Sequence, residues 1–367
     1  GFTPVSTKNQ AAAVTYAIED GSAYMQSTAY TGNGSANHAI LQTESAGGAP
    51  NSTFKPDWIW FARRDSGDSL NIYDAVRGVT KRLRSNLGSA EDTTNTANML
   101  KTFDDAGFTV GDDGAVNGTS MVAWQWLAGN SSGSSNTDGS LTSTVTANQT
   151  AGFSILTFTG NGGDGGAQTV GHGLGKKPNM IIIKNLSTTD NWVVYHDNVG
   201  FNAITLNSTA ARITTGASVY WNDTAFTSSV FTVNTHAGVN GDGNTMLCYC
   251  FADIPGYSKF GGYSGNDNAN GPYIPLNFSP AFVMLKNITA TGGWPMYDNA
   301  RTPFNPSNKN LNADQAAAEY SPDYPIDFLS NGFKIRDAQA YVNDANSYLY
   351  MAFAEHPFAG PTPATAR

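Results

Sequence analysis

Three ordered sets of short sequence phrases divide the chain into similar parts, and this internal repetition restricts the fold more than any other feature. In each part a proline precedes an apolar run, and a tyrosine follows that proline at the same distance of 17 residues. The pairs are Pro56 and Tyr73, Pro178 and Tyr195, and Pro280 and Tyr297. Repetition of this kind predicts a chain that folds one structural unit three times.

Further landmarks recur in the same order. Each part opens on a Thr/Ser-Gly-Asn phrase, carries a Val-Asn phrase near its end, and closes on an aromatic-rich run that begins at Met121, Met246 or Tyr348. The Ser/Thr/Asn-rich stretch between the first two parts is typical of a linker. The predicted division is an N-terminal segment 1–29, β unit 1 at 30–128, a linker and lead-in strand at 129–157, β unit 2 at 158–253, β unit 3 at 254–358, and a mobile tail at 359–367.

Segment length and turn chemistry predict an all-β fold. The apolar segments are short and bounded by Gly, Asn, Asp or Pro, which favours strands joined by tight turns. The run from Trp58 to Phe61 is apolar on both faces, as expected of a covered central strand. Five to seven strands in roughly 95 residues predict three tandem, homologous, β-sandwich-like units. The predicted core residues are Trp60, Ile182, Met284, Leu127, Phe251 and Phe353.

Charge restricts the partners. Charged residues make up only 13% of the chain, and the net charge is −9. A nucleic-acid binder needs a basic stripe, and the sequence has none. No stretch reaches 18 apolar residues, so we expect no membrane insertion. Cys248 and Cys250 stand at i and i+2 on a predicted strand, where they point to the same face and serve as small buried hydrophobes.

A recurring polar group accompanies the repeated tyrosine. The residue after it is Asp74, His196 or Asp298, and an arginine follows the tyrosine by four positions in the first and third units. Because a catalytic centre has no need of three copies, recurrence favours a structural role. The predicted structural network consists of Tyr73, Asp74, Arg77, Tyr195, His196, Tyr297, Asp298 and Arg301.

Other motifs that resemble sites have a structural interpretation. The Gly-rich stretch from Gly160 to Gly165 is not followed by a helical pattern, so it does not form a phosphate loop. The five histidines lack the spacing of zinc ligands. Acidic Gly/Asn loops at residues 111–114, 240–244 and 267–271 offer the oxygen atoms that calcium binds. Solvated turns are the expectation for these loops, with calcium as the alternative, and no other cofactor is predicted.

Several phrases resemble a repeated β-rich domain family in virion proteins of marine tailed bacteriophages. They are KPDWIWFARRD with YDAVRG, GFTV with VNGTSMVAWQW, HGLGKKPNMIIIKN, IPGYSKFGGYSGN, and FLSNGFKIR with YLYMAFAEHPF. The resemblance covers residues 30–358 and implies a tail fibre, spike, knob or particle-surface component. It implies no catalytic residues.

The sequence and the resemblance together predict a non-enzymatic structural protein of a phage virion. Such a protein acts by assembly and adhesion, so the expected partners are other copies of the chain and other virion proteins. The expected location is the exterior of the particle. A carbohydrate-binding module for host-surface glycans is one alternative, and a polysaccharide-degrading tailspike-type enzyme, which needs two carboxylates facing one cleft, is the other.

Overall fold

The computed structural model describes residues 15–44, 50–94, 96–216, 218–320 and 324–358. Within these ranges the chain is all-β and forms three large and three small sheets. The calls for residues 1–14 of the N-terminal segment and for the tail at 359–367 lie outside the described residues.

The three large sheets follow one another along the chain. Sheet 1 has the order β1 (Met25–Tyr30), β8 (Met121–Trp126), β3 (Trp58–Arg63), β4 (Asn71–Asp74) and β5 (Leu83–Arg84). Sheet 2 has the order β15 (Gly200–Thr205), β14 (Val193–His196), β13 (Met180–Asn185), β17 (Thr245–Phe251), β11 (Phe153–Thr159), β10 (Ser143–Asn148) and β9 (Ser134–Asn136). Sheet 3 has the order β18 (Ser258–Ser264), β25 (Ser347–Pro357), β20 (Phe278–Asn287), β21 (Pro295–Asp298) and β22 (Leu311–Asn312).

A small sheet accompanies each large one. These sheets are β2 (His38–Leu41), β7 (Gly107–Val110) and β6 (Leu100–Asp104); β12 (Gln168–Gly171) and β16 (Val230–Val233); and β19 (Tyr273–Pro275), β24 (Gly332–Ile335) and β23 (Ile326–Leu329). The helical turns within the described residues are η2 (Gly21–Ala23), η3 (Gln42–Glu44), α1 (Gly114–Asn117), η4 (Asp197–Val199), α2 (Ser218–Trp221) and α3 (Ala237–Asn240).

The repeated phrases occupy corresponding strands. In each large sheet the closing aromatic strand lies between the opening strand and the apolar strand that follows the repeated proline, and the tyrosine strand comes next. The cross-strand partners are Trp58 with Trp126, Met180 with Phe251, and Phe282 with Phe353. Each first member of these pairs stands two residues after its proline. The three sheets therefore agree in strand order and in register.

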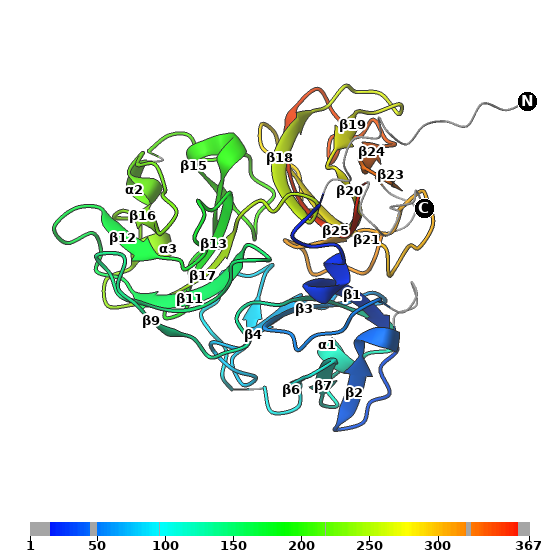
Figure 1. Ribbon diagram of the computed structural model, residues 1–367, viewed down its shortest axis with the longest axis horizontal. Coiled ribbons are helices and arrows are strands. Elements are labelled where there is room, and N and C mark those ends of the chain that lie inside the picture. The colour runs from blue at the N-terminus through cyan, green and yellow to red at the C-terminus, as the bar shows by residue number, and fades with distance from the viewer. Residues whose placement is uncertain (1–14, 45–49, 95, 217, 321–323, 359–367) are drawn as a thin grey trace, which may run out of the picture.

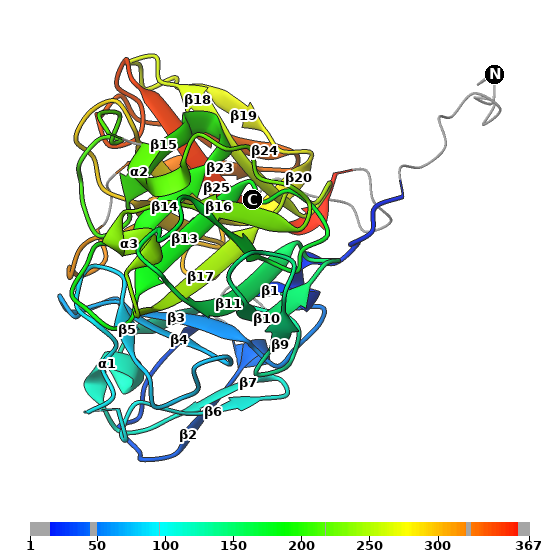
Figure 2. The same ribbon diagram turned by 90° about the vertical axis from the view of Figure 1, so that its left-hand side faces the viewer.

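The large sheets form three lobes around a common centre. Figure 1 shows the lobes of sheets 1, 2 and 3 in blue to cyan, green, and yellow to red. In the perpendicular view of Figure 2, the small sheet with β6 and β7 lies on the far side of sheet 1 from the other lobes. One face of each large sheet thus points toward the other lobes.

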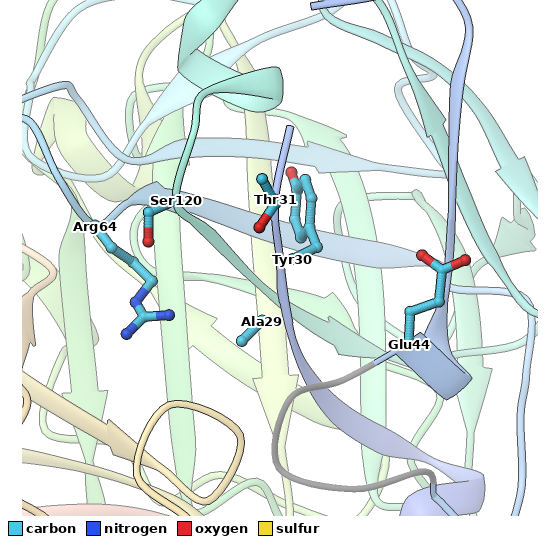
Figure 3. Close-up of a pocket in the computed structure, with 6 residues that line it drawn as sticks. All are labelled: Ala29, Tyr30, Thr31, Glu44, Arg64 and Ser120. Atoms are coloured by element: carbon cyan, nitrogen blue, oxygen red, sulfur yellow. The ribbon is translucent and has the colours of Figure 1, made fainter. Parts of the chain in front are cut away.

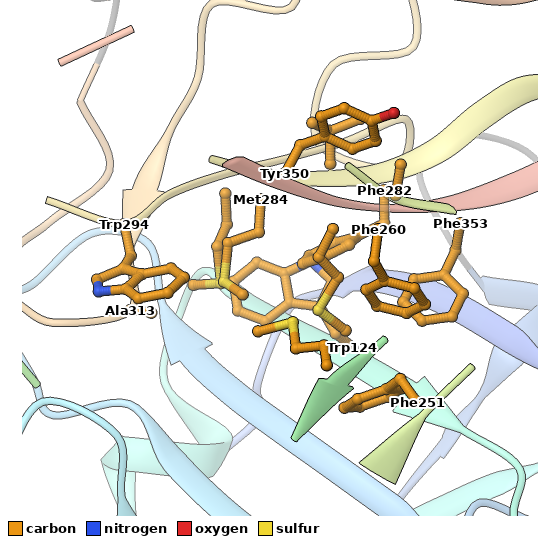
Figure 4. Packing of buried hydrophobic residues seen from close by; sticks show 14 of the residues in the cluster. Trp124, Phe251, Phe260, Phe282, Met284, Trp294, Ala313, Tyr350 and Phe353 are labelled. Carbon is orange, nitrogen blue, oxygen red and sulfur yellow. The ribbon is translucent and has the colours of Figure 1, made fainter. Parts of the chain in front are cut away.

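The inward faces share one hydrophobic core. Aromatic rings from different sheets meet there, with ring centroids 4.6 Å apart for Trp58 and Tyr249, 5.7 Å for Trp126 and Phe353, and 6.1 Å for Phe251 and Phe353. Figure 4 shows Trp124, Phe251 and Phe353 pointing into this region from separate strands. Because a buried aromatic side chain is stabilised by the apolar area that it removes from water, the sheets depend on one another for burial.

Sheets 1 and 2 each have a second core on the outward face. The outer core of sheet 1 contains Ile59, Phe61 and Phe108, which lie between the large sheet and its small sheet. The outer core of sheet 2 contains Cys248 and Cys250, which are buried free thiols, as the sequence predicted. Alternation along a strand explains why one strand serves both cores.

The segment predicted to be a linker instead forms part of sheet 2. Residues 134–136 and 143–148 are β9 and β10, and β10 pairs with β11 in register from Ser143–Phe158 to Asn148–Phe153. Val145 is buried in the outer core of that sheet. The prediction was wrong because the β-branched run from Thr144 to Thr146 favours a strand even in a segment rich in Ser and Asn, and a polar hairpin can form the edge of a sheet.

The beginning of unit 1 also differs from the prediction. β1 starts at Met25, five residues before the expected boundary, and η2 lies against the end of β25. A Cβ atom on Gly21 would lie 2.0 Å from the carbonyl oxygen of Ala354, so only glycine fits this approach. The described part of the N-terminal segment thereby joins sheet 1 to sheet 3.

One predicted core residue is not buried. Trp60, Ile182, Met284, Phe251 and Phe353 are all buried, as expected. Leu127 is only partly buried, because β8 ends at Trp126 and Trp126 takes the inward position opposite Trp58.

Candidate functional site

The recurring Asp and Arg side chains form buried ion pairs on the inward side of sheets 1 and 3. The Nε atom of Arg77 lies 2.6 Å from Oδ2 of Asp74, and both side chains are almost fully buried. In sheet 3 the Nε atom of Arg301 lies 2.6 Å from Oδ2 of Asp298, with both side chains 0% exposed. In each pair the arginine backbone N–H also donates to the Oδ1 atom, at 2.9 and 2.8 Å.

An aromatic side chain from a neighbouring sheet donates a further hydrogen bond to each carboxylate. The Tyr249 hydroxyl of sheet 2 donates to Oδ2 of Asp74 at 2.8 Å. The Trp124 indole of sheet 1 donates to Oδ2 of Asp298 at 2.9 Å. A buried charge is tolerated only when it is paired and hydrogen-bonded, and here part of the required set comes from another lobe. These carboxylates therefore couple the folding of one sheet to the position of the next.

A second acid binds the outer side of each arginine. Glu91 lies 3.1 Å from Nη1 of Arg77, and Glu319 lies 3.2 Å from Nη1 of Arg301. Glu319 also accepts two hydrogen bonds from Arg64 of sheet 1, at 2.8 and 3.1 Å. The planar guanidinium of Arg64 is thus bound in a two-point contact that joins sheets 1 and 3.

Sheet 2 has a neutral imidazole at the corresponding position. Nε2 of His196 lies 3.2 Å from the backbone oxygen of Tyr350 in sheet 3, and Nδ1 accepts the Asn198 backbone N–H at 3.2 Å. One nitrogen must donate and the other must accept, so the ring carries a single proton, on Nε2. Burial lowers the pKa of His196 to about 4.

The replacement of Asp by His matches a change in the facing strand. The register places Met351 of β25 where β8 has Trp124 and β17 has Tyr249. Methionine cannot donate a hydrogen bond to a carboxylate. A carboxylate at position 196 would therefore face no side-chain donor across this contact, whereas histidine uses the backbone carbonyl.

Backbone hydrogen bonds connect the three sheets in a closed cycle. The N–H of Glu91 in the lobe of sheet 1 donates to the Leu186 oxygen at 3.0 Å, and the N–H of Arg212 in the lobe of sheet 2 donates to the Ile288 oxygen at 3.1 Å. The N–H of Glu319 in the lobe of sheet 3 donates to the Arg64 oxygen at 2.8 Å. The three acceptors each lie eight residues after their unit's repeated proline. The carbonyl at this one repeated position thus accepts one hydrogen bond at each of the three boundaries between lobes.

The recurring tyrosines are not part of this network. Tyr73 donates to the Met99 sulfur at 3.1 Å, Tyr195 to Asp197 at 2.7 Å, and Tyr297 to the Tyr324 backbone oxygen at 2.7 Å. Adjacent residues on a strand point to opposite faces, so each tyrosine lies on the outward face while its Asp or His neighbour points inward. The predicted network was therefore wrong to include the tyrosines, because adjacency in the sequence places each tyrosine and the next residue on opposite faces of the strand.

The repeated Val-Asn phrase has a role that the sequence did not reveal. The side-chain oxygen atoms of Asn117, Asn240 and Asn343 accept the backbone N–H of the opening Asn in each unit, at 2.9, 2.9 and 3.0 Å. All three amides are buried. A buried amide that bridges two loops explains the recurrence, since an apolar residue would leave the loop N–H unpaired.

A shallow pocket lies where β1 ends. It has a volume of about 360 Å³ and is lined by Ala29, Tyr30, Thr31, Glu44, Arg64 and Ser120. Figure 3 shows Arg64 and Glu44 on opposite sides of the β1 end. Because Glu319 already neutralises Arg64, this guanidinium is not a free anion site. A pocket of about 320 Å³ occupies the matching place in sheet 3, beside Ser264, Thr289 and Ser347.

The first acidic loop contains a helix cap, because Asp113 accepts the Ala115 N–H at 2.9 Å at the start of α1. His236, which precedes the second acidic loop, caps α3 in the same way. No group of three or more His, Cys, Asp or Glu side chains within the described residues could hold a metal ion. No helix of the described chain is long and apolar enough to cross a membrane.

The comparison with family models decides the family. A model for a domain of unknown function, DUF7483, matches residues 7–357. The chain belongs to the DUF7483 family. The match includes all three large sheets, in keeping with their common core. The comparison with curated proteins gave no match, and the comparison with solved structures also gave none.

The partners of the network were beyond sequence reasoning. Tyr249, Trp124, Glu91 and Glu319 belong to different lobes from at least one group that they bind. Tyr249 and Trp124 lie in closing strands whose aromatic content predicts core packing alone. One sequence signal could have indicated these contacts. The closing strand of the third unit has Met351 where the other two have Trp124 and Tyr249, and the second unit has His196 where the other two have Asp.

Proposed function

We propose that this DUF7483 protein is a non-enzymatic structural component of a phage virion, built from three fused copies of one β unit around a pseudo-threefold axis. The chain acts by assembly, as a rigid body on the exterior of a particle, and its partners are other copies of itself and other virion proteins. The virion assignment rests on the sequence resemblance over residues 30–358.

Agreement among the lobes supports the triplication. The large sheets share the order opening, closing, apolar and tyrosine strand, and their inter-lobe hydrogen bonds end on matching carbonyls of Arg64, Leu186 and Ile288. Each sheet donates one such bond and accepts one, as subunits do in a closed cyclic assembly. A chain of three fused units around one core suits a rigid building block.

The structural role of the recurring carboxylates supports the proposal that the protein is not an enzyme. Asp74 and Asp298 are 0% exposed and are bound by an arginine and by an aromatic donor from another lobe. A catalytic carboxylate must reach its substrate directly or through one water. The carboxylates that recur in this chain hold lobes together instead, which favours a mechanical role.

Particle fractionation tests this proposal. Density-gradient-purified particles should contain the chain in a stoichiometric amount, and immunogold labelling should mark one site on the exterior. The purified chain should release no reducing sugar from bacterial polysaccharides. Absence from particles, together with polysaccharide cleavage that Asp74→Asn or Asp298→Asn abolishes, would overturn the proposal in favour of the enzyme.

A further inference from the structure

In the part of the chain that the structure describes, the exposed aromatic side chains are confined to the third lobe. Among the described residues, the large exposed aromatic side chains are Tyr273, Phe304, Tyr320 and Phe358, and all four belong to residues 254–358. Phe304 is 77% exposed, although all seven tryptophans are buried. The exposed large apolar residues of the other two lobes are aliphatic: Leu41, Leu87 and Val219. The third lobe therefore presents a chemistry that the other two do not.

Three of these residues surround the hairpin formed by β23 and β24. The Tyr273 hydroxyl donates to the Asn331 backbone oxygen in the hairpin turn, at 3.2 Å. The Phe358 N–H donates to the Asn277 oxygen at 2.9 Å, and the Asn277 N–H donates to the same Asn331 oxygen at 3.2 Å. Hydrogen bonds thus connect Tyr273 and Phe358 to one turn.

The backbone beside Phe304 is fixed to the same hairpin. The Asn305 amide donates to the Phe328 backbone oxygen at 2.7 Å and accepts the Phe328 N–H at 2.8 Å. Ser307 forms two further backbone hydrogen bonds with Ile326, at 2.7 and 3.0 Å. An exposed ring on an ordered backbone loses little conformational freedom on binding, which is the advantage of a pre-organised contact.

Paired polar groups lie among the rings. Tyr273, Lys334 and Asp327 are cross-strand neighbours in the small sheet. Arg336 lies 3.4 Å from Asp327, and the Lys334 ammonium donates to the Gly271 oxygen at 2.6 Å. Lys334 and Arg336 against Asp327 leave a net charge of only +1, so the surface favours a ligand without strong net charge.

We propose that the hairpin surface, formed by Tyr273, Phe304, Asn331 and Phe358 with Asp327 and Arg336, binds a neutral polysaccharide. The negative face of an aromatic ring attracts the polarised C–H groups of a sugar ring, and amide, carboxylate and guanidinium groups bind its hydroxyls. Asn331 lies beside Tyr273, whose hydroxyl donates to the Asn331 backbone oxygen, and the Asp327–Arg336 pair lies on the same hairpin. A stable protein partner would require a continuous apolar core within more than about 1,000 Å² of buried area.

This inference rests on the proposed function and adds the ligand class of the exterior surface. The probe is a microarray of bacterial surface polysaccharides, with hits measured again by titration calorimetry. Wild-type chain should bind at least one neutral polysaccharide. Tyr273→Ala and Phe304→Ala should each weaken binding at least tenfold, and the double variant should abolish it. Leu41→Ala, at an exposed aliphatic position of the first lobe, should stay within twofold of wild type.

Particle incorporation distinguishes the two proposals. Particles that carry the double variant should contain the same amount of chain as wild type and should lose polysaccharide binding. Absence of binding by wild type, equal binding by wild type and the double variant, or a concentration-dependent dimer that the double variant breaks would each overturn the polysaccharide inference. Absence of the chain from particles would instead contradict the virion proposal.

Discussion

The buried ion pair of sheet 3 provides the sharpest test of how the lobes hold together. Arg301→Met keeps side-chain length and apolar volume but removes the charge. Asp298 would then keep only the Trp124 indole and one backbone N–H as partners, inside a core where its side chain is 0% exposed. A buried charge without its counter-ion costs about 3–5 kcal/mol of unfolding free energy. Urea titration followed by tryptophan fluorescence measures this loss.

Two further variants isolate the cause. Arg336→Met removes an arginine that is 47% exposed and lies 3.4 Å from Asp327, so it should cost less than about 1 kcal/mol. Adding Asp298→Asn to Arg301→Met removes the uncompensated charge and should restore at least about 1 kcal/mol. A loss below about 1 kcal/mol for Arg301→Met, or no recovery in the double variant, would refute the coupling of the lobes through this carboxylate.

Four more outcomes follow from the inward faces. Tyr249→Phe removes a donor to a buried carboxylate and should cost about 1.5–3 kcal/mol in urea titration, whereas Tyr73→Phe, which loses only a sulfur contact, should cost less. Phe353→Ala should cost about 3–5 kcal/mol by the same measurement. Circular dichroism and tryptophan fluorescence should report one coincident unfolding transition, because one core joins the lobes; separate transitions would contradict this. His196 has a folded pKa of about 4, below its unfolded value of about 6.5, so its contribution to stability is lost as pH falls through that window. Wild-type minus His196→Gln stability should therefore fall by on the order of 3 kcal/mol between pH 6.5 and 4, and a flat difference would refute the neutral imidazole.

The all-β character and the positions of the main strands could be predicted from turn chemistry and apolar runs. Trp58 to Phe61 and Met180 to Ile183 became central strands because their side chains serve two cores at once. The Thr and Val residues of β10 favour a strand, but the polar composition around them favoured the interpretation as a linker. The proximity of Asp74 to Arg77 could be expected from spacing alone.

The contacts between lobes could not be predicted in the same way. Tyr249 lies 175 positions from Asp74, and nothing local indicates that their lobes meet. The alternating pleat also places Tyr73 and Asp74 on opposite faces, although they are adjacent in the chain. Three independent sandwiches and three sandwiches around one core have the same local patterns. Only the arrangement of lobes distinguishes them.

Cryo-electron microscopy of intact particles tests the central claim most directly. The account predicts a three-lobed density on the particle exterior that fits the described residues as one rigid body, with the lobes around a common centre. Particles without such a density, or with three separated lobes in variable orientations, would contradict the assignment of this chain as a rigid virion component.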